Sequence, residues 1–330
     1  MKAIVCDTWG GPENLNLKEI DPPALGPGQI RLRVEAAAVT FVDLLMPQGK
    51  YQVKPDLPFT PGSHGAGEVI EVAAGVTALN PGDRVYGYAP WGALAEEMVV
   101  DADSTFSLPK RVDNIVGAAY GNGYGTSLHA LRDRGRLQPG ETLLVHGAGG
   151  GVGLAAVDLG RAMGARVIAT ASGAEKAVVI KEYGAEEVID YTKGPFKDTV
   201  KELTDGRGAD VIYDPIGGEV FDQSLRCINW GGRLLIIGFA GGTISKAPAN
   251  LPLLKGCDIV GVSLGGFRLQ DPAAYRGLHE TLLAWIAEDR ITPRIAAKYP
   301  LERTVDALNA MANRETIGRV VVTMNSSAGD

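Results

Sequence analysis

The sequence has few cysteines, no excess of basic residues and no long apolar segment, and each shortage excludes a class of protein. Its 330 residues carry 32 Lys and Arg against 39 Asp and Glu, which gives a formal net charge of −7. Nucleic-acid surfaces need clustered positive charge, so this balance argues against a nucleic-acid partner. The apolar runs are far shorter than the roughly 20 residues needed to cross a bilayer, so we predict no membrane segment.

The three cysteines, Cys6, Cys227 and Cys257, lie far apart in the sequence. No pair has the close spacing of a metal site or a redox motif, and an odd number makes a poor disulfide framework. We therefore expect a protein of the reducing cytoplasm. The N-terminal residues reach Asp7 before an apolar signal-peptide core could form, which argues against secretion.

The hydrophobic pattern divides the chain into a β-rich part and a part in which strands and helices alternate. Residues 29–38 alternate apolar and polar side chains, as a half-buried strand does. Six short apolar strands follow between residues 142 and 262, most of them separated by helices, which predicts a parallel sheet with right-handed crossovers. Six strands are the number in a doubly wound dinucleotide-binding domain. Beyond them we expect helices near Tyr275–Glu288 and Leu301–Ala312 and a strand at Arg319–Thr323.

The sharpest motif is the glycine-rich segment His-Gly-Ala-Gly-Gly-Gly-Val-Gly-Leu at residues 146–154. It follows an apolar strand and opens a predicted helix. Backbone N–H groups at a helix N-terminus bind phosphate when no side chain blocks the approach. We therefore predict dinucleotide binding, the alternative being a tight turn without a ligand. The residues concerned are Gly147, Gly150, Gly151, Val152 and Gly153.

The end of the second strand of the alternating region indicates which dinucleotide binds. An NAD site usually has Asp or Glu there for the ribose 2′-hydroxyl, but this chain has Ala171. Ser172 can donate a hydrogen bond, and Lys176 can reach a 2′-phosphate. These residues favour NADPH over NADH, although Lys176 could instead be a solvated helix lysine.

An ordered series of short segments resembles the quinone oxidoreductase branch of the medium-chain dehydrogenase/reductase superfamily. The series covers nearly the whole chain, and this makes the resemblance highly specific. Besides the glycine-rich turn, the matching segments are residues 49–51, 58–62, 81–85, 138–142, 213–218, 231–234, 237–239, 253–256 and 316–321.

The resemblance implies an α/β protein with a GroES-like β-rich catalytic domain and a doubly wound parallel Rossmann domain. The catalytic domain would comprise residues 1–122 and 265–330, the Rossmann domain residues 123–264, and NADPH would bind in the cleft between them. The resemblance also implies a homodimer joined through the edge strand near Ile259–Leu264. The implied cofactor contacts are Gly150, Gly151, Val152, Ser172, Lys176, Tyr191, Gly238 and Phe239. Tyr191 would stack or hydrogen-bond near the 2′-phosphate, unless it merely packs at its strand end.

The chain departs from the zinc-dependent members of the superfamily at their ligand positions. A cysteine ligand is replaced by Thr40, and the Gly-His-Glu triplet becomes Gly62-Ser63-His64. The cysteine quartet of the structural zinc lobe is also missing. Zinc sites need four N, S or O ligands, and none can be assembled here. We therefore predict a zinc-independent protein in which His64 packs or forms hydrogen bonds.

Two residues are expected to act on the substrate. Thr40 stands where quinone reductases usually have an Asn near the nicotinamide, and it keeps a hydroxyl donor but loses the amide. Tyr51 matches the tyrosine of a Gly-x-Tyr segment that supplies a proton or holds an oxyanion in related enoyl reductases. The alternative is that Tyr51 only packs on the substrate. The expected reaction is hydride transfer from NADPH to a quinone or, alternatively, to an enone or 2-enoyl thioester.

Three other interpretations of the function remain open. The segment Gly-Val-Ser-Leu-Gly around Ser263, with Asp271 and His279 downstream, matches the order of a hydrolase triad. A nucleophile elbow needs a helix directly after the serine, and the glycines and proline that follow argue against one. A short-chain dehydrogenase is disfavoured by the position of the glycine motif and the lack of a Tyr-x-x-x-Lys pair. A non-catalytic NADPH-binding protein would have almost the same sequence.

Overall fold

The structure, a computed structural model, describes residues 1–324. The chain forms two compact units. The first unit takes Met1–Asn122 and the chain from Pro293 onward, and the second takes Gly123–Thr292. The family resemblance implied that residues 265–330 belong to the catalytic domain, whereas the helices Leu264–Gln270 and Pro272–Ala287 lie in the second unit.

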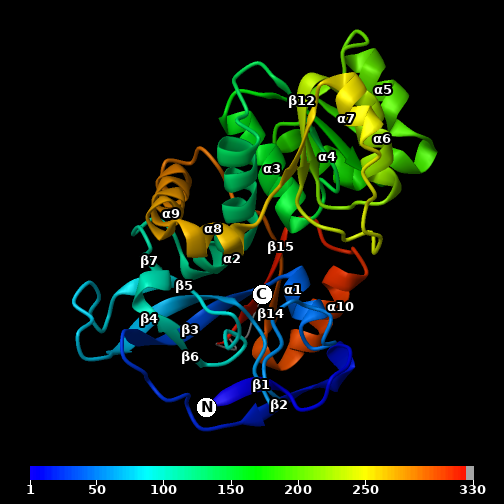
Figure 1. The fold of residues 1–330 in the computed structure, drawn as a ribbon. Coiled ribbons are helices and arrows are strands. Elements are labelled where there is room, and N and C mark those ends of the chain that lie inside the picture. The colour runs from blue at the N-terminus through cyan, green and yellow to red at the C-terminus, as the bar shows by residue number, and fades with distance from the viewer. Residues whose placement is uncertain (325–330) are drawn as a thin grey trace. The chain divides into compact units, whose positions relative to one another are not determined.

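The first unit is built on a seven-stranded sheet with the order β14-β15-β3-β4-β5-β7, in which β6 pairs with β3. All the pairings of β3 are antiparallel, and β14 and β15 run parallel. A separate two-stranded sheet joins β1 and β2. Two helices, α1 and α10, contact each other in this unit (Figure 1). The bounds are β1 Lys2–Cys6, β2 Leu15–Glu19, β3 Gln29–Val39, α1 Phe41–Leu45, β4 His64–Val72, β5 Arg84–Tyr88, β6 Glu97–Asp101, β7 Thr105–Ser107, β14 Ile295–Pro300, α10 Thr304–Ala312 and β15 Arg319–Thr323.

The second unit is built on a six-stranded parallel sheet with the order β10-β9-β8-β11-β12-β13. Counted from its first strand, the order is 3-2-1-4-5-6, which is that of a dinucleotide-binding doubly wound fold. The predicted fold class is therefore confirmed. The strand bounds are β8 Thr142–Val145, β9 Arg166–Ala171, β10 Glu187–Asp190, β11 Ala209–Asp214, β12 Ile228–Ile236 and β13 Asp258–Gly261.

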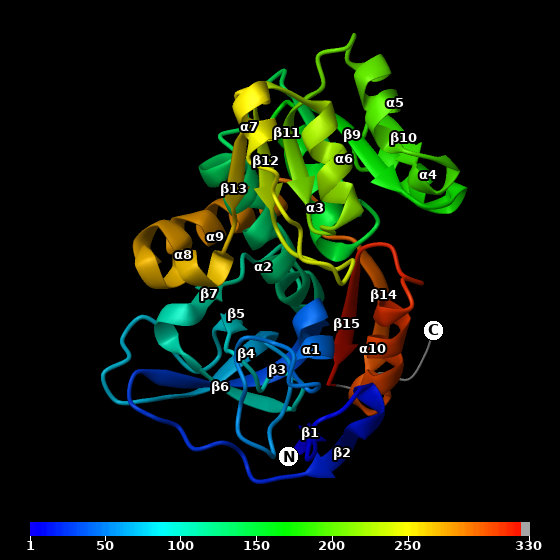
Figure 2. The same ribbon diagram turned by 45° about the vertical axis from the view of Figure 1, so that its right-hand side comes forward.

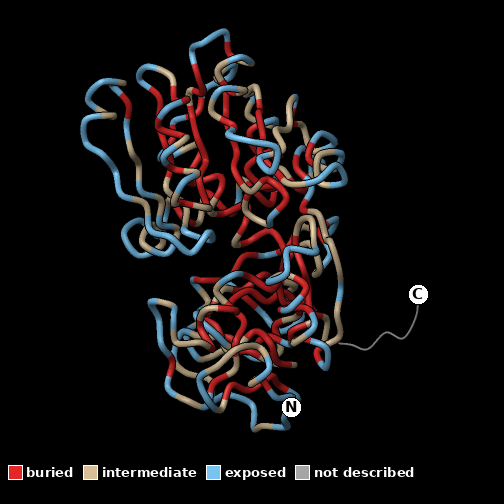
Figure 3. The backbone as a smooth tube through the Cα atoms, turned by 90° about the vertical axis from the view of Figure 1, so that its right-hand side faces the viewer, coloured by how far each residue is buried: buried red, intermediate tan, exposed pale blue. Residues whose placement is uncertain are grey.

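Helices connect successive strands of this sheet and cover it (Figure 2). Right-handed crossovers place α3 and α4 on one face and α5 and α6 on the other, and α6 contacts both α5 and α7. The bounds are α3 Gly151–Ala162, α4 Ala174–Glu182, α5 Phe196–Leu203, α6 Glu219–Cys227, α7 Asn250–Lys255, α8 Leu264–Gln270 and α9 Pro272–Ala287. In both units the buried backbone follows the central strands (Figure 3).

Several elements differ from the sequence-based expectation. Helix α2, Asn114–Leu128, was not predicted, because most of its residues are small or apolar and it shows no polar face. A π-helix, His129–Arg134, continues it. Strand β14 was also missed, since Ile-Ala-Ala-Lys-Tyr-Pro shows neither alternation nor β-branched enrichment. Among residues 1–324, no helix has both the length and the apolar character needed to cross a membrane.

The prediction that no helix follows Ser263 directly was wrong, because α8 begins at the next residue. Ser263 caps this helix, and its Oγ accepts a hydrogen bond from Gly266 N at 3.1 Å. Asp271 caps α9 in the same way, with Oδ1 accepting from Ala274 N at 2.9 Å. Side-chain caps satisfy N–H groups that otherwise lack partners in the first turn, and this offsets the poor helix propensity of the glycines. Two members of the suggested triad therefore act as helix caps.

Candidate functional site

The glycine-rich turn joins the end of β8 to the start of α3, and it requires glycine at two positions, Gly147 and Gly153. Gly147 has φ of +59°, in the left-handed region that favours glycine. A Cβ on Gly153 would lie 2.3 Å from the carbonyl oxygen of Gly147, a distance that no real Cβ tolerates. Helix α3 can approach the strand this closely only because residue 153 is glycine.

The N-terminus of α3 has the properties of an anion site. Its N-cap residue, Gly150, makes no side-chain capping bond. Gly150 is exposed, and Gly151 and Val152 are half-buried, so the backbone at the first turn is accessible. N–H groups in the first turn of a helix have no partner within the helix, and the helix dipole favours negative charge there. The turn thus fits a dinucleotide diphosphate, and the assignment of Gly147–Gly153 to that role stays a prediction.

The predicted 2′-phosphate residues lie at the ends of two neighbouring strands. Ala171 in β9 is the register partner of Asp190 in β10, so Ser172 and Tyr191 both leave the sheet at the same edge. Tyr191 is exposed. Lys176, in the first turn of α4, packs its stem on the glycine turn, since its Cδ lies 3.2 Å from where a Cβ on Gly149 would be.

Asp190 is a residue of this region that the sequence analysis missed. Its Oδ1 accepts hydrogen bonds from Thr192 N at 3.0 Å and from Thr192 Oγ1 at 2.7 Å. These bonds hold the pKa of Asp190 below its usual range, with smaller help from Lys193. A carboxylate here repels a 2′-phosphate, but its contacts with Thr192 and Lys193 moderate this effect. The Asp-x-Thr spacing, typical of an Asx turn, was the available signal.

Gly238 and Phe239 follow β12 in a loop that folds over the turn after β11. Ala240 N donates to the carbonyl oxygen of Pro215 at 3.0 Å, and Gly218 N donates to Ser245 Oγ at 2.9 Å. β8, β9, β11 and β12 are parallel, so their carboxyl ends share one edge of the sheet. The structure therefore gathers the predicted cofactor residues of the second unit at a single edge.

Thr40 lies in the first unit, at the N-cap of α1, and is bonded to a buried carboxylate. Thr40 N and Thr40 Oγ1 donate to Asp43 Oδ2 at 2.7 and 2.9 Å, and Gly62 N donates to Asp43 Oδ1 at 3.1 Å. The hydroxyl proton of Thr40 is therefore directed at Asp43, and Thr40 itself is almost fully buried. Asp43 was missed by the sequence analysis, although Thr-x-x-Asp is the spacing of a capping box.

Burial raises the pKa of Asp43, while the bonds from Thr40 and Gly62 and the charge of Arg319 act in the opposite direction. Tyr51 is half-buried and packs against the core of the first unit. Burial also raises the pKa of Tyr51, and the neighbouring Tyr88 and Asp43 add to the effect. Tyr51 is therefore a neutral phenol at pH 7 and is able to donate a proton.

His64 is a buried, hydrogen-bonded residue, as predicted. Its Nδ1 lies 2.7 Å from the hydroxyl oxygen of Tyr86, and its ring packs 5.3 Å from that of Tyr88. Ser63, at the position of the zinc-ligand histidine, donates from Oγ to the carbonyl oxygen of Pro90 at 3.2 Å. Within residues 1–324, no cluster of three or more His, Cys, Asp and Glu side chains is arranged to hold a metal ion.

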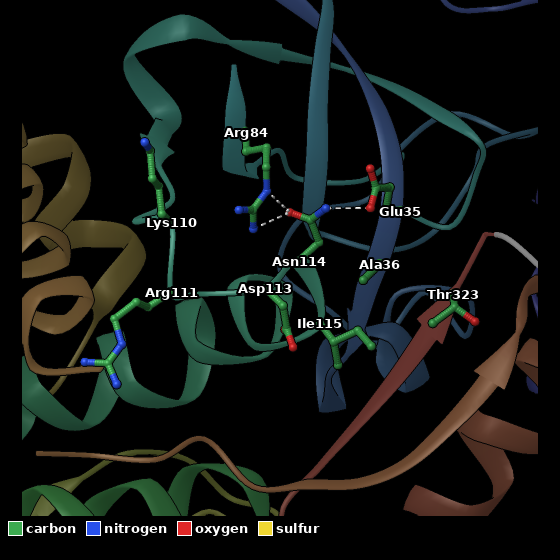
Figure 4. Close-up of a pocket in the computed structure, with 9 residues that line it drawn as sticks. All are labelled: Glu35, Ala36, Arg84, Lys110, Arg111, Asp113, Asn114, Ile115 and Thr323. Carbon is green, nitrogen blue, oxygen red and sulfur yellow. Dashed lines mark hydrogen bonds between the residues drawn. The ribbon is translucent and has the colours of Figure 1, made fainter. Parts of the chain in front are cut away.

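A cavity of about 430 Å³ opens in the first unit, but it contains none of the predicted site residues. Arg84 donates to Asn114 Oδ1, and Asn114 Nδ2 donates to Glu35 Oε2 at 2.6 Å (Figure 4). These contacts hold the start of α2 against β3 and β5. The lining residues are Glu35, Ala36, Arg84, Lys110, Arg111, Asp113, Asn114, Ile115 and Thr323.

Comparison with known proteins agrees with the fold. The family model described as an alcohol dehydrogenase GroES-like domain matches residues 26–110, and the one described as a zinc-binding dehydrogenase matches residues 151–284. A quinone oxidoreductase-like protein 2 homolog from Nematostella vectensis is 40% identical over 97% of this chain and 88% of its own length. The chain belongs to the quinone oxidoreductase branch of the medium-chain dehydrogenase/reductases.

Solved structures of this family superpose on the whole chain. The mycobacterial protein Rv1454c complexed with NADPH has a TM-score of 0.92 and 32% identity, and the match covers 98% of this chain and 100% of that one. Escherichia coli quinone oxidoreductase complexed with NADPH has a TM-score of 0.92 and 29% identity, with the same coverage. The predicted resemblance is thus confirmed, and the chain is an enzyme of this oxidoreductase family.

Proposed function

We propose that this enzyme uses NADPH to reduce a quinone by hydride transfer. The proposal rests chiefly on the glycine turn at Gly147–Gly153, whose geometry fits a dinucleotide diphosphate, in a chain related to quinone oxidoreductases. NADPH complexes of two structural relatives support the choice of cofactor. When bound, NADPH supplies the hydride.

The residues that hold the cofactor follow from their places at the strand ends. The N–H groups of Gly151 and Val152 bind the diphosphate at the start of α3. The Gly150 N–H donates to the carbonyl oxygen of Gly147 at 2.9 Å, and Gly150 has no side chain to obstruct the diphosphate. Ser172, Lys176 and Tyr191 hold the 2′-phosphate, with Lys176 as the cationic partner. Gly238 and Phe239 line the part of the site that holds the nicotinamide end of NADPH.

The residues that act on the acceptor lie in the first unit. Tyr51 donates a proton, or a hydrogen bond, to the oxygen on which negative charge develops during the reaction. Thr40, whose hydroxyl proton is directed at Asp43, accepts a hydrogen bond and shapes the site rather than donating. Asp43 is a positioning residue, because it fixes the orientation of Thr40 and binds the backbone at Gly62.

Reduction of an enone or a 2-enoyl thioester is the second candidate reaction, and Tyr51 is the observation that favours it. A phenol that burial keeps protonated is a competent acid for an enolate. A hydroquinone anion is intrinsically more stable and needs less help. A strong dependence on the Tyr51 hydroxyl would therefore favour the enone reaction.

Three further properties belong to this proposal. The reaction is zinc-independent, because Thr40 and Ser63 replace zinc ligands of related enzymes. The enzyme works in a reducing cytoplasm, which suits three buried free thiols. It forms a homodimer through β13, an edge strand of its sheet near the exposed side chains of Trp230 and Leu253. Light scattering on the wild type and on Trp230→Asp tests the dimer.

The decisive experiment is a panel of acceptors, in which oxidation of NADPH is followed at 340 nm with quinones, enals, enones and enoyl-CoA esters. Turnover that is fastest with quinones supports the proposal, and turnover only with enones or enoyl esters supports the second candidate. If no acceptor supports NADPH oxidation although NADPH binds, both reactions are excluded and the protein is a binding protein.

A further inference from the structure

Exposed aromatic side chains gather around one segment of the first unit. In its described part, five large apolar side chains are exposed, namely Trp9, Leu17, Phe41, Val53 and Trp91. Trp9 and Trp91 lie on loops that contact the segment Phe59–Gly62, and Phe41 begins the helix whose Asp43 binds Gly62 N. Trp9 is 42% exposed and Trp91 41%. Grouped apolar exposure of this kind marks a binding surface more often than isolated exposure does.

Trp9 is held firmly in place despite its exposure. Gly10 N donates to the carbonyl oxygen of Pro47 at 2.9 Å, which ties the Trp9 loop to the loop that carries Tyr51. The indole ring lies over Gly49, since its Cε3 is 3.6 Å from where a Cβ on that residue would be. Its ring centroid is 6.1 Å from that of Phe59. One part of the indole therefore packs on the protein, and the rest remains open to a ligand.

The segments that contact Trp9, around Gly49 and Phe59, also carry or hold the residues proposed to act on the acceptor. Tyr51 is two residues beyond Gly49, the residue that Trp9 covers. Beyond Phe59, Gly62 N binds the Asp43 carboxylate that also holds Thr40. The turn that carries Trp91 is bonded to the Phe59 segment as well, because Gly92 N donates to the carbonyl oxygen of Thr60 at 2.8 Å.

We propose that Trp9 is a specificity-determining residue, whose indole stacks on a second ring fused to the quinone ring of the acceptor. The inference rests on the proposed function and deepens it, because it selects fused-ring quinones over single-ring quinones and over acyclic enoyl esters. Flat π-systems bind well to an indole face or edge, and an already immobilised tryptophan loses little conformational entropy when it binds them. A single-ring quinone has no second ring to stack on Trp9.

The test compares 1,4-naphthoquinone with 1,4-benzoquinone, which differ by one fused ring. In Trp9→Leu, we expect kcat/KM for naphthoquinone to fall about two- to tenfold, the size of an aromatic stacking contribution. The value for benzoquinone should stay constant. Trp9→Phe keeps a ring and should retain most of the naphthoquinone preference. Leu17→Ala removes an exposed apolar side chain of the first unit that lies away from this segment, and it should change neither value.

Binding measured without turnover separates this inference from the proposed reaction. The Kd of naphthoquinone, from calorimetry with NADP⁺ present, should rise about two- to tenfold in Trp9→Leu and remain constant in Leu17→Ala. An unchanged Kd and an unchanged ratio of kcat/KM values in a folded Trp9→Leu protein would overturn the role of Trp9. If the wild type reduces neither quinone, the proposed function fails, while the Kd comparison still decides whether Trp9 binds the fused ring.

Discussion

Lys176 offers the sharpest test of how the enzyme selects NADPH. Its stem lies on the glycine turn at Gly149, so truncation to alanine would remove both packing and charge. Lys176→Met keeps an apolar stem of similar length and removes only the ammonium group. Any loss of affinity in this variant therefore reports on the charge.

The magnitude follows from the strength of a charge-assisted hydrogen bond, about 1.5 to 3 kcal/mol. Because about 1.4 kcal/mol is a factor of ten in affinity, Lys176→Met should weaken NADPH binding by about 10- to 100-fold. Lys176 is only partly buried, and solvent screening places the effect toward the lower end of this range. NADH lacks the 2′-phosphate, and its affinity should change by less than about twofold.

The assay is a fluorescence titration that gives Kd for NADPH and NADH at two ionic strengths. Salt should weaken NADPH binding more in the wild type than in Lys176→Met, since screening acts on the charge pair. Lys181→Ala is the matched control, because Lys181 lies on the same helix and its Nζ is 3.5 Å from Glu187 Oε2. Equal losses for NADPH and NADH would mean that Lys176 only supports the turn, and the reasoning would be refuted.

Four other predictions test the remaining features. Tyr51→Phe should slow enone reduction about 10²- to 10⁴-fold and quinone reduction much less; unchanged kcat/KM values for both would refute the donor role. Gly153→Ala should weaken NADPH and NADH alike and lower Tm, because its Cβ would meet Gly147 O, and wild-type affinity would contradict this. Dialysis against a chelator should leave the rate of NADPH oxidation unchanged, and stoichiometric zinc in metal analysis would contradict zinc independence. Burial lowers the pKa of His146 to about 3, so the unfolded state binds a proton that the folded state does not, and stability falls as pH drops below about 6.5. His146→Gln should therefore shrink the difference in unfolding free energy between pH 7 and pH 5 by about 2 kcal/mol, measured in urea; an unchanged difference would exclude His146 as the source.

The sequence alone determined most of the second unit, because its signals are local. Alternating strands and helices, each bounded by glycine or proline, indicated the parallel sheet, and spacing within one turn indicated the phosphate site. Gly147 and Gly153 were identifiable because a turn from a strand into a helix needs glycine where φ is positive or where the backbones approach closely. The helix after Ser263 was not predicted because its two glycines have poor helix propensity. Only the structure shows that Ser263 caps it.

Only the tertiary structure decided what surrounds Thr40 and Tyr51. Gly62 and Asp43 are 19 residues apart, and their hydrogen bond depends on how the loop between α1 and β4 folds back on α1. The contact of Trp9 with Gly49 likewise joins segments about 40 residues apart. Such contacts arise from packing between distant segments, whose geometry no local pattern encodes. The sequence therefore indicated the type of fold and a candidate phosphate site, while the partner of the Thr40 proton and the contacts of Trp9 required the folded chain.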